Sequence, residues 1–236
     1  MDAARTFTTG QIVLVLMLAQ SVVAAAVLVL APLIARRGAD LGSMPRRSGY
    51  VLYFVAVGLG FMLLEISFLQ RFGLYLGYPT YTISVVLFSL LIFAGLGSLL
   101  SARIAPPYER ALTAALAALV PLTMLYLLGL SVIFGATLGA SLPVRIAIAV
   151  ALLAPLGLLL GVFFPLGITL VSARSVHFVP WAWAITGCAG VVGTILAVML
   201  AISWDFRVVA LLALAIYAAG VGALAWAEKA RPAAVV

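Results

Sequence analysis

The sequence has few charged side chains. Only 8% of its 236 residues are Asp, Glu, Lys or Arg, whereas a soluble domain carries about 25%. So few charges cannot cover a water-facing surface, and this excludes a soluble globular protein. The chain also has one cysteine, Cys188, and one histidine, His177. These numbers exclude an internal disulfide and argue against a metal site.

Catalytic motifs are lacking as well. The chain has no Walker loop, no nucleophile elbow and no HExxH pattern. Its last apolar run has no lysine before Lys229, at its very end, which excludes a retinal Schiff base. We therefore expect no catalytic residues, no metal and no cofactor, and an enzyme embedded in the membrane is the least favoured reading.

Long apolar runs are what the sequence has in place of charge. Hydrophobic residues make up 67% of the chain, and its mean hydropathy is +1.33. A bilayer core requires about 20 apolar residues per helix, and the runs do not alternate as transmembrane strands do. The sequence therefore predicts an all-α integral membrane bundle of seven transmembrane helices in one polytopic domain, 1–236. The predicted spans are 11–34, 50–70, 80–102, 111–134, 144–171, 180–203 and 208–227.

The basic residues predict an orientation for these spans. Nine fall in one set of loops: Arg36, Arg37, Arg46, Arg47, Arg103, Arg110, Arg174, Lys229 and Arg231. Four fall in the other: Arg5, Arg71, Arg145 and Arg207. Cytoplasmic loops carry the excess of Lys and Arg, so we expect the N-terminus outside and the C-terminus in the cytoplasm. The formal net charge of +7 is interpreted as this topology signal and not as a nucleic-acid site.

Glu65 is an acid within an apolar run. It lies five residues before the predicted end of its span, about 7–8 Å inside that boundary. An acid inside a membrane is a functional-site hypothesis by default; the alternative is a structural clasp between the second and third spans. Its expected surroundings are Gln70, Arg71, Thr80, Tyr81, Thr82 and Ser84, with Arg145 or Arg207 as an outer-loop partner.

Prolines, tryptophans and small residues mark three further features. Pro121, Pro155 and Pro165 lie inside predicted spans and are candidate helix breaks, of the kind that lines transporter sites or is repaired by neighbouring helices. Trp181 and Trp183 are expected to anchor the interface. Small residues three or four apart, such as those of 94–98, 187–197 and 218–222, predict close helix packing.

The stretch "GLGFMLLEISFLQRFGLYLGYPTYTISVVLFSLLIFAGLGSLLS" carries a resemblance, which "GVFFPLGITLVS" and "PWAWAITGCAGVVGTILAVMLAISWDF" extend. The pattern falls on Gly58, Gly60, Phe61, Met62, Glu65, Gln70, Arg71, Leu76, Gly77, Pro79, Tyr81, Ser84 and 95–98. Together these stretches resemble the membrane module of bacterial spermidine synthase-like fusion proteins, which implies the cytoplasmic (inner) membrane. The chain has no soluble aminopropyltransferase-like domain and no acidic polyamine pocket. The resemblance therefore implies a related fold and not aminopropyl transfer.

Two functional hypotheses remain besides a membrane enzyme. The first is a non-catalytic module that anchors or scaffolds a partner, so that its partners are the bilayer and other membrane or membrane-associated subunits. The second is a small permease or channel, for a cationic amine such as a polyamine if the resemblance extends to the substrate.

Overall fold

The chain is helical throughout its described part. The computed structural model describes the backbone of residues 3–35 and 46–229, and the side chains of 12–28 and 46–229. The α-helices are α1 (Ala3–Ala35), α2 (Arg47–Leu76), α3 (Pro79–Ser101), α4 (Tyr108–Thr137), α5 (Leu142–Ser172), α6 (Val179–Ser203) and α7 (Phe206–Glu228), with a short 3-10 helix, η1 (Val176–Phe178), before α6. No strand occurs within these ranges. The predicted all-α class is thus confirmed.

Six helices, α2 to α7, are long and apolar enough to cross a membrane. In α1, the apolar part whose side chains are described, Ile12–Leu28, is shorter. These helices support a multi-pass membrane protein, while the seventh crossing and the orientation stay predictions.

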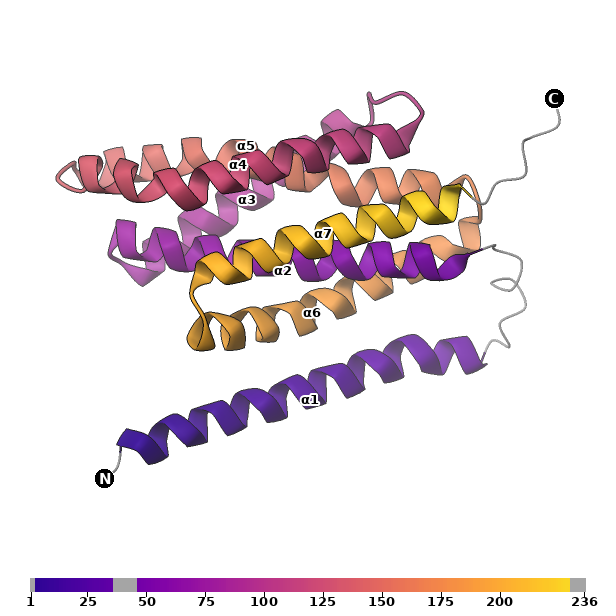
Figure 1. The fold of residues 1–236 in the computed structure, drawn as a ribbon, viewed down its shortest axis with the longest axis horizontal. Coiled ribbons are helices and arrows are strands. Elements are labelled where there is room, and N and C mark those ends of the chain that lie inside the picture. Colours follow the sequence, from indigo (N-terminus) through magenta and orange to yellow (C-terminus); the bar gives the residue numbers. More distant parts are fainter. Residues whose placement is uncertain (1–2, 36–45, 230–236) are drawn as a thin grey trace.

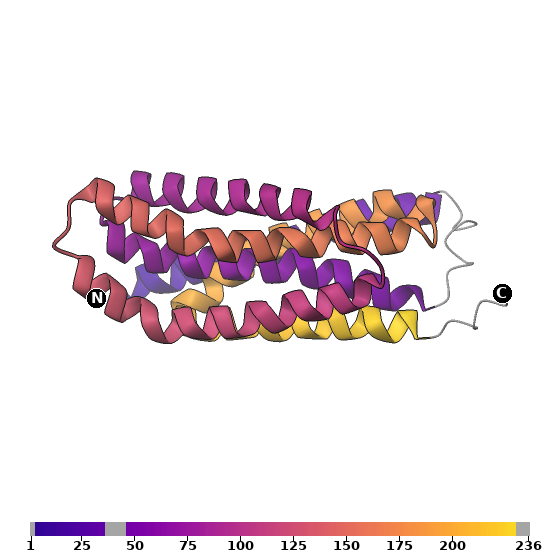
Figure 2. The same ribbon diagram turned by 90° about the horizontal axis from the view of Figure 1, so that it is seen from above.

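Helix α2 lies at the centre of the bundle (Figures 1 and 2). It packs chiefly against α7 and α6, while α3 packs against α5, and α4 against α5 and α7. Helix α1 lies along α6 at one side of the molecule (Figure 1). The core is therefore built around α2, whose aromatic residues Tyr53, Phe54 and Phe72 are fully buried.

Small residues let α3 and α5 approach closely. A Cβ added to Gly97 would collide with the Leu158 carbonyl, and one added to Gly161 would collide with Ala94. In lipid, such close backbone approach is a main source of helix association. The predicted small-residue packing is confirmed at Gly97. It is not found at Gly95, beside which a Cβ would meet open space.

A tight turn joins α2 to α3. Gly77 has φ +79° and donates its backbone N–H to the Gly73 carbonyl at 3.0 Å, a left-handed conformation that glycine adopts readily. Pro79 occupies the first turn of α3. Helix α3 begins without a side-chain cap, and the Thr82 hydroxyl donates to the Tyr78 carbonyl at 2.9 Å.

Candidate functional site

Glu65 lies deeper along its helix than the sequence indicated. Helix α2 continues past Gln70 to Leu76, so 11 residues follow Glu65, a rise of about 16 Å. The helix continues because 72–76 are apolar, and because Arg71 places its guanidinium 4.4 Å from the Phe206 ring centroid. The Glu65 side chain is buried, with 7% of the residue exposed.

The expected hydroxyl partners do not meet Glu65. Thr80, Tyr81 and Ser84 are exposed, and the Thr82 hydroxyl is bonded within its own helix. No hydrogen bond or ion pair to the Glu65 carboxyl occurs among the residues with described side chains. The hydroxyls of α3 do not reach Glu65 because of the direction in which its side chain points. At helical spacing, Glu65 lies on the same face of α2 as Gly58 and Met62. Both lie against α6, since a Cβ added to Gly58 would meet the Thr186 carbonyl and one added to Gly193 would lie 3.3 Å from Met62.

The basic residues near the same end are engaged elsewhere. Arg145 donates from Nη1 to the Tyr75 carbonyl at 2.8 Å. Arg207 lies 3.8 Å from the Asp205 carboxylate in the turn between α6 and α7. Gln70 is exposed. Neither outer arginine therefore pairs with Glu65.

The prolines do not break their helices. Helix α4 continues through Pro121, and α5 continues through Pro155 and Pro165. Tyrosine hydroxyls donate to carbonyls just before two of them, Tyr126 to Leu152 and Tyr53 to Phe163, both at 2.5 Å. Neighbouring helices of a membrane bundle stabilise proline-containing segments by such bonds. This corrects the expectation of a broken fifth span.

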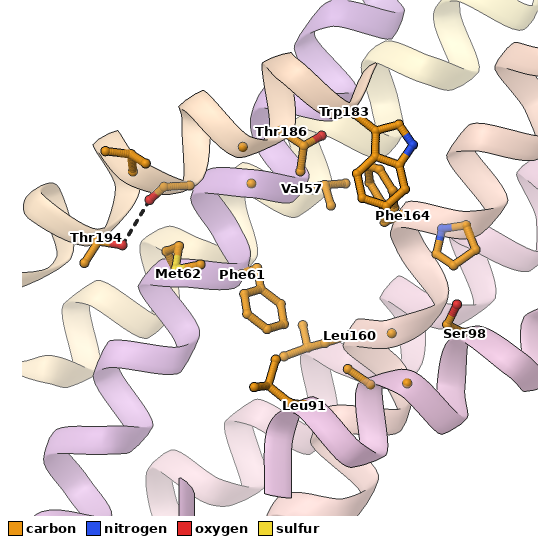
Figure 3. A pocket seen from close by; sticks show the side chains of 18 residues that line it. Val57, Phe61, Met62, Leu91, Ser98, Leu160, Phe164, Trp183, Thr186 and Thr194 are labelled. Carbon is orange, nitrogen blue, oxygen red and sulfur yellow. Dashed lines mark hydrogen bonds between the residues drawn. The ribbon is translucent and has the colours of Figure 1, made fainter. Parts of the chain in front are cut away.

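A cavity of about 670 Å³ opens between α2, α3, α5 and α6. Figure 3 shows Phe61, Leu91, Leu160 and Phe164 around a common space. The Thr186 hydroxyl donates to the Phe54 carbonyl at 3.3 Å, and that of Thr194 to the Gly190 carbonyl at 3.0 Å. The cavity is therefore apolar along most of its length.

The mouth of the cavity faces the surroundings of the bundle. Leu91, Val191 and Trp183 line it and are 58%, 57% and 62% exposed. The two tryptophans expected at the interface differ in setting. Trp183 packs edge-on against Phe164 with centroids 4.6 Å apart, whereas Trp181 is partly buried against the core.

A polar cluster that sequence reasoning missed joins α2, the turn after α5, and α7. The Tyr50 hydroxyl donates to Oε1 of Glu228, and Nη2 of Arg174 lies 2.6 Å from Oε2. Glu228 is buried, and its hydrogen bond raises the pKa of the Arg174 guanidinium above its ordinary value. The sequence did contain a signal, because the three residues fall at span ends on the same predicted side. Glu228 was overlooked because it adjoins Lys229 where the last apolar run ends.

These features define a multi-pass helical membrane protein with a lateral apolar cavity and a polar cluster at one end. Among the described side chains, no three His, Cys, Asp or Glu residues gather as a metal-binding group. No protein-family model, curated protein or solved structure matches the chain.

Proposed function

We propose that the chain is a non-catalytic integral membrane module that anchors or scaffolds a partner protein within a membrane complex. The observation that supports this most is how several interior polar side chains connect the helices. Tyr53 and Tyr126 bond α2 and α4 to carbonyls of α5, and Glu228 bonds to Tyr50 and Arg174. Polar side chains used in this way hold helices together, which suits a rigid platform.

We also propose that the module lies in the bacterial cytoplasmic membrane with its N-terminus outside and its C-terminus in the cytoplasm. Described basic residues support this orientation: Arg46, Arg47, Arg103, Arg110, Arg174 and Lys229 lie where helices end near the Glu228 cluster. Helix α1 begins at the opposite end of the bundle from the end of α7 (Figure 1). The excess of basic residues belongs in the cytoplasm.

Cross-linking in native membranes tests the scaffold. A photoreactive residue at Leu128, 75% exposed on α4, or at Leu99, 71% exposed on α3, samples two outer faces. We expect one of the two faces to capture a stoichiometric protein partner, which also co-purifies in mild detergent. A clean monomer with cross-links to no polypeptide from either face would refute the scaffold.

A permease or channel for a cationic amine is the second candidate. It is favoured by Glu65, a buried acid with no hydrogen-bond partner in the described residues. Proteoliposomes should then transport an amine such as spermidine, and Glu65→Gln should abolish the flux while the fold persists. Asp205→Asn, in the exposed turn between α6 and α7, is the control. Absence of flux from the parent protein would reject this candidate and leave the scaffold unaffected.

A further inference from the structure

The lateral cavity has the dimensions of a chain-binding site. From Trp183 to Thr194 its α6 wall covers 12 residues, a rise of roughly 16 Å of helix. One leaflet of the hydrocarbon core is about 15 Å deep. The volume of about 670 Å³ lies within the range of small-molecule pockets. A helix of the same length and about 10 Å in diameter would fill roughly 1,200 Å³, so the cavity suits a thinner occupant.

Two residues with hydrogen-bond donors line the same end of this cavity. Ser98 and Trp183 are near the C-terminal end of α3 and the N-terminal end of α6, and Figure 3 shows both at the same side. Neither the Ser98 hydroxyl nor the Trp183 indole N–H donates a hydrogen bond within the described part of the chain. The threonine hydroxyls farther along are bonded to backbone carbonyls. The cavity thus has a polar end and an apolar body.

Two glycines supply the open space. An added Cβ would meet no atom within 4 Å at Gly95 on α3 or at Gly187 on α6. At Gly97 and Gly161, by contrast, the neighbouring helix occupies the space that a Cβ would take. Their small size keeps the cavity open and does not serve contact between the helices of this chain.

We propose that this cavity binds one acyl chain of a membrane phospholipid, with its ester or phosphate oxygens accepting hydrogen bonds from Trp183 and Ser98. A linear chain matches the length and the volume. A transmembrane helix about 10 Å in diameter exceeds that volume. The exposed mouth at Leu91 and Val191 admits the chain sideways from the bilayer. This binding site is independent of the scaffold function proposed above.

Photolabelling tests the proposal on the full chain. The protein is reconstituted with phosphatidylcholine bearing a diazirine within one acyl chain, transferred into detergent to remove loosely held lipid, irradiated and cut with trypsin. Because arginines separate the helices, fragment 175–207 contains α6 and fragment 72–103 contains α3, whereas 111–145 and 208–229 contain most of α4 and α7. We expect retained label in the first two fragments. Label spread evenly over all four, or no retained label, would overturn the proposal.

Matched glycine variants locate the site. Gly187→Leu and Gly95→Leu fill the cavity from opposite walls and should lower the retained label about fivefold, the factor that a loss of about 1 kcal/mol in affinity produces. Gly222→Leu adds the same side chain to α7, where an added Cβ also meets no atom within 4 Å, and should leave the label unchanged. Helicity and monodispersity identify the folded variants. Unchanged label in either folded cavity variant, or a cross-link from position 187 to a polypeptide in native membranes, would contradict lipid binding.

The polar end is tested separately with Trp183→Phe, which keeps an aromatic ring and removes the indole N–H. Retention of the phosphatidylcholine probe should fall, while retention of a photoreactive alkane without a headgroup should not. An equal effect on both probes would show that Trp183 does not bind the headgroup end.

Discussion

Nη2 of Arg174 lies 2.6 Å from Oε2 of Glu228, and this pair joins the turn after α5 to the end of α7. The Tyr50 hydroxyl approaches the other carboxylate oxygen from α2. Three segments that are far apart in the sequence therefore meet at one carboxylate. Only 5% of the Glu228 side chain is exposed, against 27% for Arg174.

Replacing Glu228 should destabilise the bundle. Glu228→Gln keeps the size but removes the charge, and we expect the free energy of unfolding to fall by about 1–3 kcal/mol, because both donors lose a charged acceptor. Asp205→Asn is the control, since its pair with Arg207 is 3.8 Å long and half exposed and is expected to contribute about 1 kcal/mol or less. Denaturant titration in detergent measures both. Equal effects would show that the Glu228 cluster is no stronger than a surface pair.

Gly97→Ala should loosen the contact between α3 and α5. The added methyl group would meet the Leu158 carbonyl, and overpacking of this kind costs about 1–3 kcal/mol. Gly222→Ala has open space around the methyl group. This variant should be neutral or slightly stabilising, because alanine has a higher helix propensity than glycine. Thermal unfolding of the two variants compares them. A stable Gly97→Ala protein would mean that the helices separate at little cost.

Tyr53→Phe should weaken the link between α2 and α5. It removes the hydroxyl that donates to the Phe163 carbonyl at 2.5 Å, and interhelical hydrogen bonds in membranes are worth about 0.6–1.7 kcal/mol. Tyr81→Phe removes an exposed hydroxyl that forms no hydrogen bond within the described residues, and should have no effect. The difference in unfolding free energy between these two variants is the quantity to measure.

Substitutions of Glu65 distinguish the observed packing from the predicted clasp. Without a hydrogen-bond partner in the described residues, the buried carboxyl carries a desolvation cost, so Glu65→Leu should leave stability unchanged or raise it by about 1–3 kcal/mol. Glu65→Gln should fold normally. A loss of about 1–2 kcal/mol in Glu65→Leu would instead support an interhelical hydrogen bond of the kind that the sequence predicted.

Cysteine labelling tests the proposed orientation. In a Cys188→Ser background, an impermeant reagent should label Ser141→Cys, between α4 and α5, from outside the cell. Ser43→Cys lies outside the described residues and should be labelled only after permeabilisation. Labelling of Ser43→Cys in intact cells would reverse the proposed topology.

Hydropathy was sufficient to predict six of the helices, because a run of apolar residues is itself the requirement for crossing a bilayer. Hydropathy ended α2 six residues too early, at Gln70, because the charged Arg71 interrupts the apolar run. In the structure Arg71 stays within the helix, and its guanidinium packs over the Phe206 ring. That contact depends on α7, more than 130 residues later, and local sequence does not reveal it.

For Glu65 and the cavity, the sequence could predict only which residues of one helix share a face. Helical spacing puts Glu65 close to the face of Gly58 and Met62, and these two residues share α6 as a neighbour. Spacing alone could not say that this face meets α6, because that is set by the arrangement of the whole bundle. The cavity escaped prediction for the same reason, as four helices contribute its walls.

Helix α1 packs against α6 at the side of the bundle and adds one helix to the six that follow it. Helices α2 to α7 are six in number, and α2 begins at the same end of the molecule at which α7 finishes (Figure 1). An even number of passes returns the polypeptide to its starting side. Helix α1 alone therefore decides whether a domain joined before it faces a domain joined after α7 across the membrane or shares a compartment with it.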